Sequence, residues 1–183
     1  MELQQLLKEC KKQSITAQKY LYDRFAVQLY LVCRRYLKTN EQAEEILHNG
    51  FLKIFTGLLQ FNYTTDAAFI AWLNKIMINE CLMDLRKKNN FLLVTEDEAE
   101  NIIVDELIEN KLNADTIYTL ITQLPIGYRT VFNLYCIEGY SHNEIAIALN
   151  ISGGTSKSQL NKARKMLQQL IVNNESYENR KAK

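Results

Sequence analysis

The chain has 183 residues, of which 47% are hydrophobic, and it contains one proline and six glycines. This length allows one large domain or two small ones, and the hydrophobic fraction excludes wholesale disorder. Scarce proline and glycine, together with abundant Leu, Ile, Ala, Lys, Glu and Gln, predict an all-α protein.

Charge divides the chain into blocks that the net charge of +1 hides. Residues 1–90 and 116–183 each carry a net charge of +4, whereas residues 91–115 carry −7. This pattern predicts two basic modules that can each approach a polyanion, joined by an acidic linker with short helical pieces. The final stretch, residues 173–183, has little to bury and is expected to form a flexible tail.

Cellular location and redox state are predicted from what the sequence lacks. No apolar run reaches the roughly 20 residues needed to cross a bilayer, and the N-terminus does not resemble a signal peptide. The four cysteines, Cys10, Cys33, Cys81 and Cys136, include no C-x-x-C pair. We therefore expect a cytoplasmic protein that is not inserted in a membrane, with reduced and mostly buried thiols and no metal site.

The first basic module is expected to be helical throughout. One helix spans about residues 16–38, and a second begins after the capping pair Thr39-Asn40 with glutamates in its first turns. The segment FNYTTD, residues 61–66, breaks the pattern, and a third helix follows over about residues 67–88. Apolar residues recur every three or four positions in each helix, so each has one buried face.

The last module contains a helix from Pro125 to about Glu138 that Gly139 can end in a left-handed conformation. Four residues are expected to lie on or near the core face of this helix: Val131, Phe132, Tyr135 and Cys136.

A second pair of helices follows in the stretch from residue 138 to residue 167. Ser141 and Glu144 form an S-x-x-E capping box, Asn150 can end the short helix, and Ser152 can cap the next. In that next helix the apolar residues repeat at helical spacing, so its polar residues must face water. The residues predicted to be buried are Leu160, Ala163, Leu167 and Leu170, and those predicted to face water are Thr155, Lys157, Ser158, Asn161, Lys162, Arg164 and Lys165.

Two short helices with a tight turn and a basic second helix are typical of a helix-turn-helix. Such a helix can enter the DNA major groove, which is roughly 12 Å wide. The same spacing also fits an ordinary helical hairpin with a solvated basic face.

The stretch LPIGYRTVFNLYCIEGYSHNEIAIALNISGGTSKSQLNKARKML resembles region 4 of bacterial sigma factors of the sigma-70 family, in particular the extracytoplasmic-function (ECF) group. The segments LYDRFAVQLYLVCRRYL, QAEEILHNGFLKIF and FIAWLNKIMINECLMDLRKK resemble successive parts of region 2. The resemblance implies an alternative sigma factor, not an enzyme, with no cofactor. Its implied partners are core RNA polymerase, promoter DNA and, as in related proteins, an anti-sigma factor. Region 2 would span residues 1–90, the linker 91–115 and region 4 residues 116–172.

The resemblance also implies roles for residues of region 2. Core polymerase would bind Glu44, Glu45, His48 and Asn49. His48 and Asn49 depart from the family pattern A-E-D-x-x-Q-E, which leaves one fewer carboxylate for basic residues of the polymerase. The −10 element would be bound by Phe61, Asn62, Tyr63, Thr64, Lys75, Asn79 and Arg86.

Three residues of this part carry alternative interpretations. Phe69 and Trp72 fit a core position as well as a DNA contact. Asn79 lies in an apolar stretch, where a buried amide would need partners, so its functional interpretation is preferred.

For the −35 element, the resemblance places Lys157, Ser158, Asn161 and Lys162 toward base edges. Thr155, Arg164 and Arg129 would lie near phosphates. Gly153 stands where the family usually has an acidic residue, so a looser turn is expected there.

Two other functions remain open from the residues. A DNA-binding regulator that does not bind polymerase could carry the same helix-turn-helix, although response regulators usually add an α/β domain that is not predicted here. A helical adaptor that binds only protein would show no salt-sensitive affinity for DNA. An enzyme is disfavoured because no Gly-rich phosphate loop, metal-ligand cluster or catalytic triad spacing is present.

Overall fold

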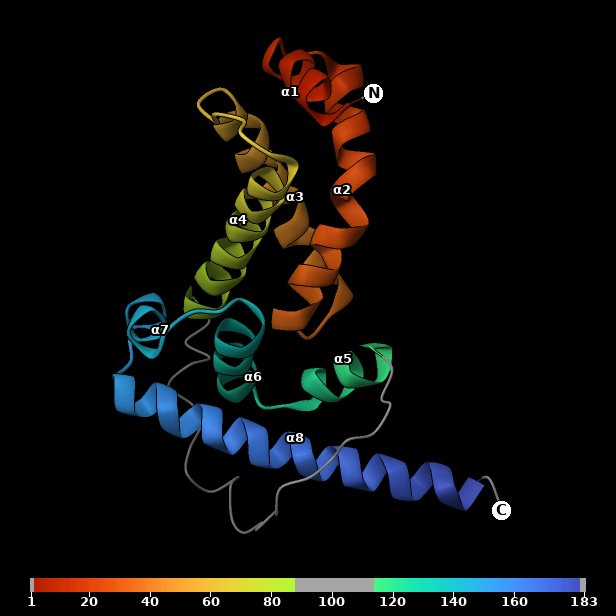
Figure 1. The fold of residues 1–183 in the computed structure, drawn as a ribbon, viewed down its shortest axis with the longest axis vertical. Coiled ribbons are helices and arrows are strands. Elements are labelled where there is room, and N and C mark those ends of the chain that lie inside the picture. The colour runs from red at the N-terminus through yellow and green to blue at the C-terminus, as the bar shows by residue number, and fades with distance from the viewer. Residues whose placement is uncertain (1, 88–113, 182–183) are drawn as a thin grey trace. The chain divides into compact units, whose positions relative to one another are not determined.

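The computed structural model describes residues 2–87 and 114–181, and the described residues form helices and no strands (Figure 1). The all-α prediction is therefore confirmed. The chain divides into two compact units, Met1–Asp84 and Leu85–Lys183. Most of the predicted acidic linker lies outside the described residues, and the predicted domain limits at residues 90, 115 and 172 stay predictions.

The first unit contains four helices. They are α1 (Leu3–Lys11), α2 (Ile15–Tyr36), α3 (Asn40–Leu58) and α4 (Asp66–Lys87). Helices α2, α3 and α4 match the three predicted helices to within one or two residues. The prediction of a module that is helical throughout gave no bounds for α1, although Leu3, Leu6, Leu7 and Cys10 recur at the spacing of a buried helical face and are all buried.

Close contacts join α2, α3 and α4 in the core of this unit. The Phe25 ring of α2 meets the Phe69 ring of α4 edge-on at 5.8 Å. Helices α3 and α4 approach closely at Gly50, where an added Cβ would lie 2.3 Å from the Sδ atom of the buried Met77. An ion pair of 2.5 Å joins Lys53 of α3 to the largely buried carboxylate of Glu80 in α4.

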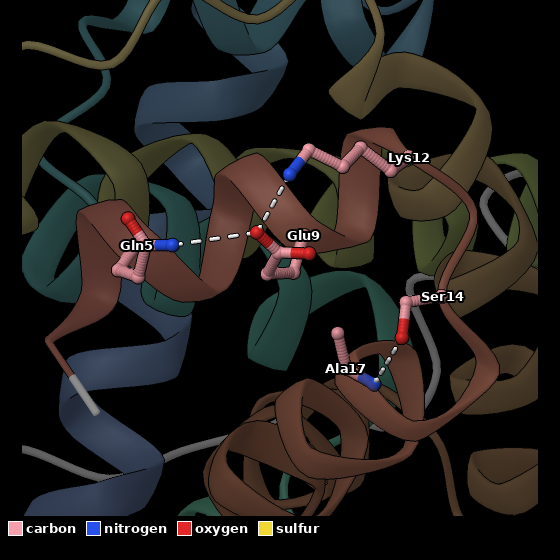
Figure 2. A network of polar contacts seen from close by, with 5 residues as sticks. All are labelled: Gln5, Glu9, Lys12, Ser14 and Ala17. Carbon is pink, nitrogen blue, oxygen red and sulfur yellow. Dashed lines mark hydrogen bonds and ion pairs between the residues drawn. The ribbon is translucent and has the colours of Figure 1, made fainter.

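Side-chain caps fix where these helices begin. Thr39 accepts a hydrogen bond from the Gln42 amide, as predicted for the start of α3. Ser14 caps α2 by accepting from the Ala17 amide, and on the neighbouring α1 Glu9 accepts from both Gln5 and Lys12 (Figure 2). The bonds to Thr39 and Ser14 satisfy backbone amides that have no partner inside the helix.

The second unit contains α5 (Ala114–Gln123), α6 (Ile126–Phe132), the π-helical segment η2 (Asn133–Ile137), α7 (His142–Leu149) and α8 (Gly153–Lys181). Residues of α5 and α6 pack on the long helix α8. The buried cluster consists of Leu120, Ile121, Leu124, Tyr128, Ala163 and Leu167. Helix α8 continues past residue 172 into the predicted tail, whose flexibility stays a prediction.

The helix predicted from Pro125 to Glu138 changes to π-helical geometry at Asn133. The wider turn rotates the following side chains relative to an α-helix. Asn133 and Leu134 are buried, and Tyr135 and Cys136 are exposed. The prediction that Tyr135 and Cys136 belong to the core face was therefore wrong. Gly139 ends the segment with a φ of 75°, as predicted.

All four cysteines are free, and Cys10, Cys33 and Cys81 are buried. A hydrogen bond with Cys33, together with burial, raises the pKa of Cys81 well above its usual value. Burial also raises the pKa of the Cys10 thiol. Thiols with raised pKa values are poor nucleophiles, which agrees with a structural role for these side chains.

Candidate nucleic-acid interface

The helix-turn-helix predicted from the sequence is formed by α7, a short turn and the start of α8. Ser141 and Glu144 make the capping box in both directions, and the Ser141 amide donates to Glu144 Oε2 at 2.8 Å. Asn150 ends α7 in the left-handed region with a φ of 55°. Ser152 then accepts a hydrogen bond of 2.9 Å from the Thr155 amide at the start of α8. Each of these local features was predicted.

Helix α8 separates a buried side from an exposed side. Ser156, Gln159, Leu160, Ala163 and Leu167 are buried. The predicted water-facing residues all lie on the other side, and only Lys162 among them is half-buried. They are Thr155, Lys157, Ser158, Asn161, Lys162, Arg164 and Lys165. The exposed side therefore offers cationic, amide and hydroxyl groups of the kind that bind base edges and phosphates.

Two aromatic side chains outside α8 support its exposed side. The Tyr135 ring stacks on the His142 ring at 4.6 Å, and the Arg164 guanidinium lies 5.8 Å from the centre of the Tyr135 ring. His142 Nδ1 and the Oγ of the buried Ser156 are 2.9 Å apart, a hydrogen-bond distance. Segment η2 and helix α7 thus both contact α8, through Tyr135 and His142, for which the sequence predicted no such role.

Arg129 does not belong to this exposed surface. Its side chain is fully buried in α6, and its Nη1 atom donates a hydrogen bond of 2.9 Å to the backbone oxygen of Thr122. The prediction that Arg129 lies near phosphates was therefore wrong. The side chain faces the interior because α6 packs against α8 on that side, and the carbonyl of α5 supplies a polar partner there.

A second candidate surface lies at the loop between α3 and α4. Phe61 packs on Trp72 with ring centres 4.6 Å apart and on Phe69 at 5.4 Å. Phe69 is fully buried, whereas Phe61 and Trp72 are half-buried. Phe69 is thus a core residue, and the alternative that it contacts DNA directly does not fit its burial. Phe61 and Trp72 keep ring surface accessible to a base.

The loop residues after Phe61 are tied to the start of α4. Tyr63 donates a hydrogen bond from its hydroxyl to Asp66 Oδ1, and the Asp66 carboxylate raises the pKa of the Tyr63 phenol. Thr65 caps α4 by accepting from the Ala68 amide at 3.1 Å. Asn62 and Thr64 are exposed between these fixed points. The loop therefore presents an amide and a hydroxyl to solvent from a defined backbone.

Helix α4 continues this surface with three exposed polar residues. Lys75, Asn79 and Arg86 follow one another at intervals of four and seven positions, which places them on one face of the helix. Asn79 is exposed, so the alternative that its amide packs in the core does not fit, and its role in DNA binding stays a prediction. The apolar neighbours of Asn79 in the sequence lie on the opposite, buried face of α4.

A third surface lies on α3, where the predicted polymerase-binding residues Glu44, Glu45, His48 and Asn49 are all exposed. The His48 ring is stacked nearly parallel to the Tyr22 ring of α2 at 6.4 Å. Tyr22 also packs on Phe51 at 4.5 Å. The His48 imidazole is thus held beside the two carboxylates by an aromatic neighbour that the sequence did not reveal.

Neither a metal site nor a membrane span is found in the described residues. No group of three or more His, Cys, Asp or Glu side chains lies close enough there to hold a metal ion. No helix in that part of the chain combines the length and the apolar character that crossing a bilayer requires.

Two family models match the chain, and each covers one unit's exposed polar surface. The model for sigma-70 region 2 matches residues 21–91, and the model for sigma-70 region 4 matches residues 114–167. Together they span more than half of the chain, in the family's order. The first contains the α3 surface, the loop and α4, and the second contains α7 and the first turns of α8.

Curated relatives carry the same family name. The ECF RNA polymerase sigma factor SigW of Bacillus subtilis is 25% identical over 184 residues, which cover 93% of this chain and 97% of that protein. The ECF RNA polymerase sigma factor SigM of Mycobacterium tuberculosis is 28% identical over 82% of this chain and 75% of its own length.

Two solved structures are also similar to this chain. The sigma factor RpoE of Bartonella quintana, in complex with the anti-sigma factor NepR, aligns with a TM-score of 0.49 and 20% identity over 84% of this chain and 96% of that chain. CnrH in complex with the cytosolic domain of CnrY aligns with a TM-score of 0.48 and 21% identity over 91% of this chain and 95% of that chain.

Both family models and the full-length relatives agree with the two sets of motifs in the sequence. The chain belongs to the sigma-70 family, as an ECF sigma factor that directs RNA polymerase to promoters.

Proposed function

We propose that this sigma factor recognises the −35 element with α8 and the −10 element with the loop 61–66 and α4. The observation that carries the proposal is the division of α8 into a packed side and a side of exposed donors, placed directly after a capped helix-turn-helix. Such a helix has the width and the chemistry to enter the major groove of a duplex.

At the −35 element, Lys157, Ser158, Asn161 and Lys162 would contact base edges. Asn161 is the side chain suited to a bidentate contact with adenine, and the lysines suit guanine. Thr155 and Arg164 would contact phosphates and so set the position of α8 in the groove. The Tyr135 ring beside Arg164 favours a fixed guanidinium over a freely moving one.

At the −10 element, the loop would hold a base that has left the stack. The half-buried Phe61 and Trp72 rings offer a stacking surface, and Asn62, Tyr63 and Thr64 offer hydrogen-bonding groups next to it. Stacking on aromatic side chains is the usual way to bind an unpaired base. Lys75, Asn79 and Arg86 would contact the neighbouring strand along α4.

Core polymerase would bind the α3 surface. Glu44 and Glu45 are exposed carboxylates that basic polymerase residues can approach, and His48 and Asn49 extend the same surface. An anti-sigma factor is the further partner that the resemblance implies. In this proposal region 2 spans residues 1–90, the linker residues 91–115 and region 4 residues 116–172. The protein is located in the cytoplasm and has no catalytic activity.

The first test is co-purification of the tagged chain with bacterial core RNA polymerase, followed by transcription from a pool of genomic fragments. The account predicts retention of polymerase and new, sequence-specific start sites. Retention without new start sites would contradict it. Salt-sensitive DNA binding without retention would favour a DNA-binding regulator that works alone, and the absence of both would favour a helical adaptor.

A double variant tests the division of labour between the surfaces. Lys157→Ala with Lys162→Ala should reduce promoter-specific transcription by about tenfold or more, because two cationic contacts to DNA are lost. Retention of core polymerase should not change. Lys12→Ala with Lys19→Ala removes the same charge from α1 and α2 and should leave transcription within about twofold. Equal loss of polymerase binding by the α8 variant would contradict the assignment.

A further inference from the structure

A lysine of helix α1 forms a hydrogen bond with the loop of the proposed −10 site. The Lys11 ammonium, in the last turn of α1, donates a hydrogen bond of 2.8 Å to the backbone oxygen of Phe61, 50 positions further along the chain. The bond is partly buried. Helix α1 precedes the residues that the region 2 family model matches, which begin at residue 21.

With this bond, both backbone polar groups of Phe61 have hydrogen-bond partners. The Phe61 amide donates to the backbone oxygens of Gly57 and Leu58 at 3.1 and 3.2 Å, at the end of α3. Its carbonyl accepts the hydrogen bond from the Lys11 ammonium. Because both polar groups of this residue are bonded, the chain leaves α3 in one direction, and the Phe61 ring is held against Trp72.

The far end of the loop is fixed separately, by the Tyr63–Asp66 hydrogen bond and the Thr65 cap. Lys11 is therefore the contact from outside α3 and α4 that holds the near end. A hydrogen bond from a charged donor is stronger than one between neutral groups, so it suits this task.

We propose that Lys11 is a positioning residue for the capture of the unpaired −10 base. It contacts no DNA itself, but it sets the backbone from which Phe61, Asn62 and Tyr63 reach the base. A loop that is already ordered binds more tightly because it loses less conformational freedom on binding. The inference rests on the proposed function, in which this loop reads the −10 element.

The neighbouring lysine supplies a matched control. Lys12 lies on the same turn, but its ammonium bonds Glu9 of its own helix at 2.9 Å and its side chain is 70% exposed (Figure 2). Lys11→Met and Lys12→Met remove the same charge from adjacent positions. Only the first removes the bond to Phe61. A difference between the two variants therefore reports on the loop and not on the charge of α1.

The test uses the holoenzyme reconstituted with each variant and a fluorescent single-stranded oligonucleotide carrying the −10 strand of the strongest promoter recovered from the genomic pool. Lys11→Met should weaken binding of this strand about five- to tenfold. Lys12→Met should stay within twofold of the wild type, and Lys11→Arg should restore most of the affinity because arginine can donate the same bond. Affinity for −35 duplex and retention of core polymerase should not change.

Hydrogen exchange in the free protein gives a readout that does not depend on DNA. The amides of residues 62–65 should exchange faster in Lys11→Met than in Lys12→Met, while the amides of α3 keep their protection. Equal strand affinity or equal loop exchange in the two variants would overturn the inference. If the wild-type holoenzyme itself fails to bind the strand, the proposed −10 function fails, and the role of Lys11 in DNA capture fails with it.

Discussion

The two proposed DNA surfaces are built in different ways. On α8 the contact residues lie along one side of a single helix, and the packing of that helix uses the other side. At the −10 loop, the contact residues depend on α1, α3 and α4, and Phe61 belongs both to the packing and to the site. A site on one helix face can change its sequence preference without loss of stability, whereas a change at Phe61 in the loop also alters packing.

The largest expected effect concerns the buried arginine of the second unit. Arg129→Ala should lower the free energy of unfolding of that unit by about 3 kcal/mol, because packing and a buried hydrogen bond to Thr122 are lost. Hydrogen exchange of α8 amides measures the change, and exchange of α3 amides should not respond. Arg164→Ala, at an exposed position, serves as the control. If Arg129→Ala left the stability unchanged but weakened DNA binding, Arg129 would be a phosphate contact after all, and its structural role would be contradicted.

A pair of variants sharpens the contrast between the two surfaces. Phe61→Ala should reduce transcription and also destabilise the first unit by about 1–2 kcal/mol, because its ring packs on Phe69 and Trp72. Asn161→Ala should reduce transcription with a change in stability below about 0.5 kcal/mol. Chemical denaturation and transcription from the same promoter test both. Similar losses of stability in Phe61→Ala and Asn161→Ala would contradict the distinction between a site that shares the packing and a site that does not.

Removal of the capping box is expected to have a smaller effect on the stability of the second unit. Ser141→Ala should destabilise the helix-turn-helix by about 1 kcal/mol, because the Glu144 amide loses its acceptor. Ser158→Ala, on the exposed side of α8, should leave stability unchanged. Thermal unfolding followed by circular dichroism compares the two variants. Equal melting temperatures would show that the box does not stabilise this unit.

The smallest expected effect concerns the ring under Arg164. Tyr135→Leu should weaken affinity for −35 duplex about two- to fivefold, because a cation–π contact at an exposed site contributes about 0.5–1 kcal/mol. Tyr135→Phe keeps the ring and should keep the affinity. Fluorescence anisotropy with the reconstituted holoenzyme measures both. A loss of the same size in Tyr135→Phe would point to the hydroxyl in place of the ring.

Local chemistry explains which parts of the fold and the site could be predicted. The caps at Thr39, Ser141 and Ser152 and the left-handed Asn150 depend on neighbours within four residues, so the sequence revealed them. The spacing of Leu160, Ala163 and Leu167 likewise placed the exposed side of α8.

The features that were missed depend on contacts between distant residues. The π-helical turn at Asn133 moves Tyr135 out of the core and toward His142, which no helical periodicity indicates. Arg129 was assigned the wrong burial because residue type alone does not fix the face on which a side chain lies. The bond from Lys11 to Phe61 joins positions 50 apart, so it becomes visible only in the folded unit.

The measurement that tests the account most directly is transcription from a promoter library randomised separately in the −35 and −10 elements. Holoenzymes containing the wild type, Asn161→Ala and Phe61→Ala would be compared on the same library. The account predicts that Asn161→Ala relaxes preference within the −35 element alone and that Phe61→Ala weakens preference within the −10 element alone. A change in −10 preference caused by Asn161→Ala, or in −35 preference caused by Phe61→Ala, would contradict the assignment of one DNA element to each surface.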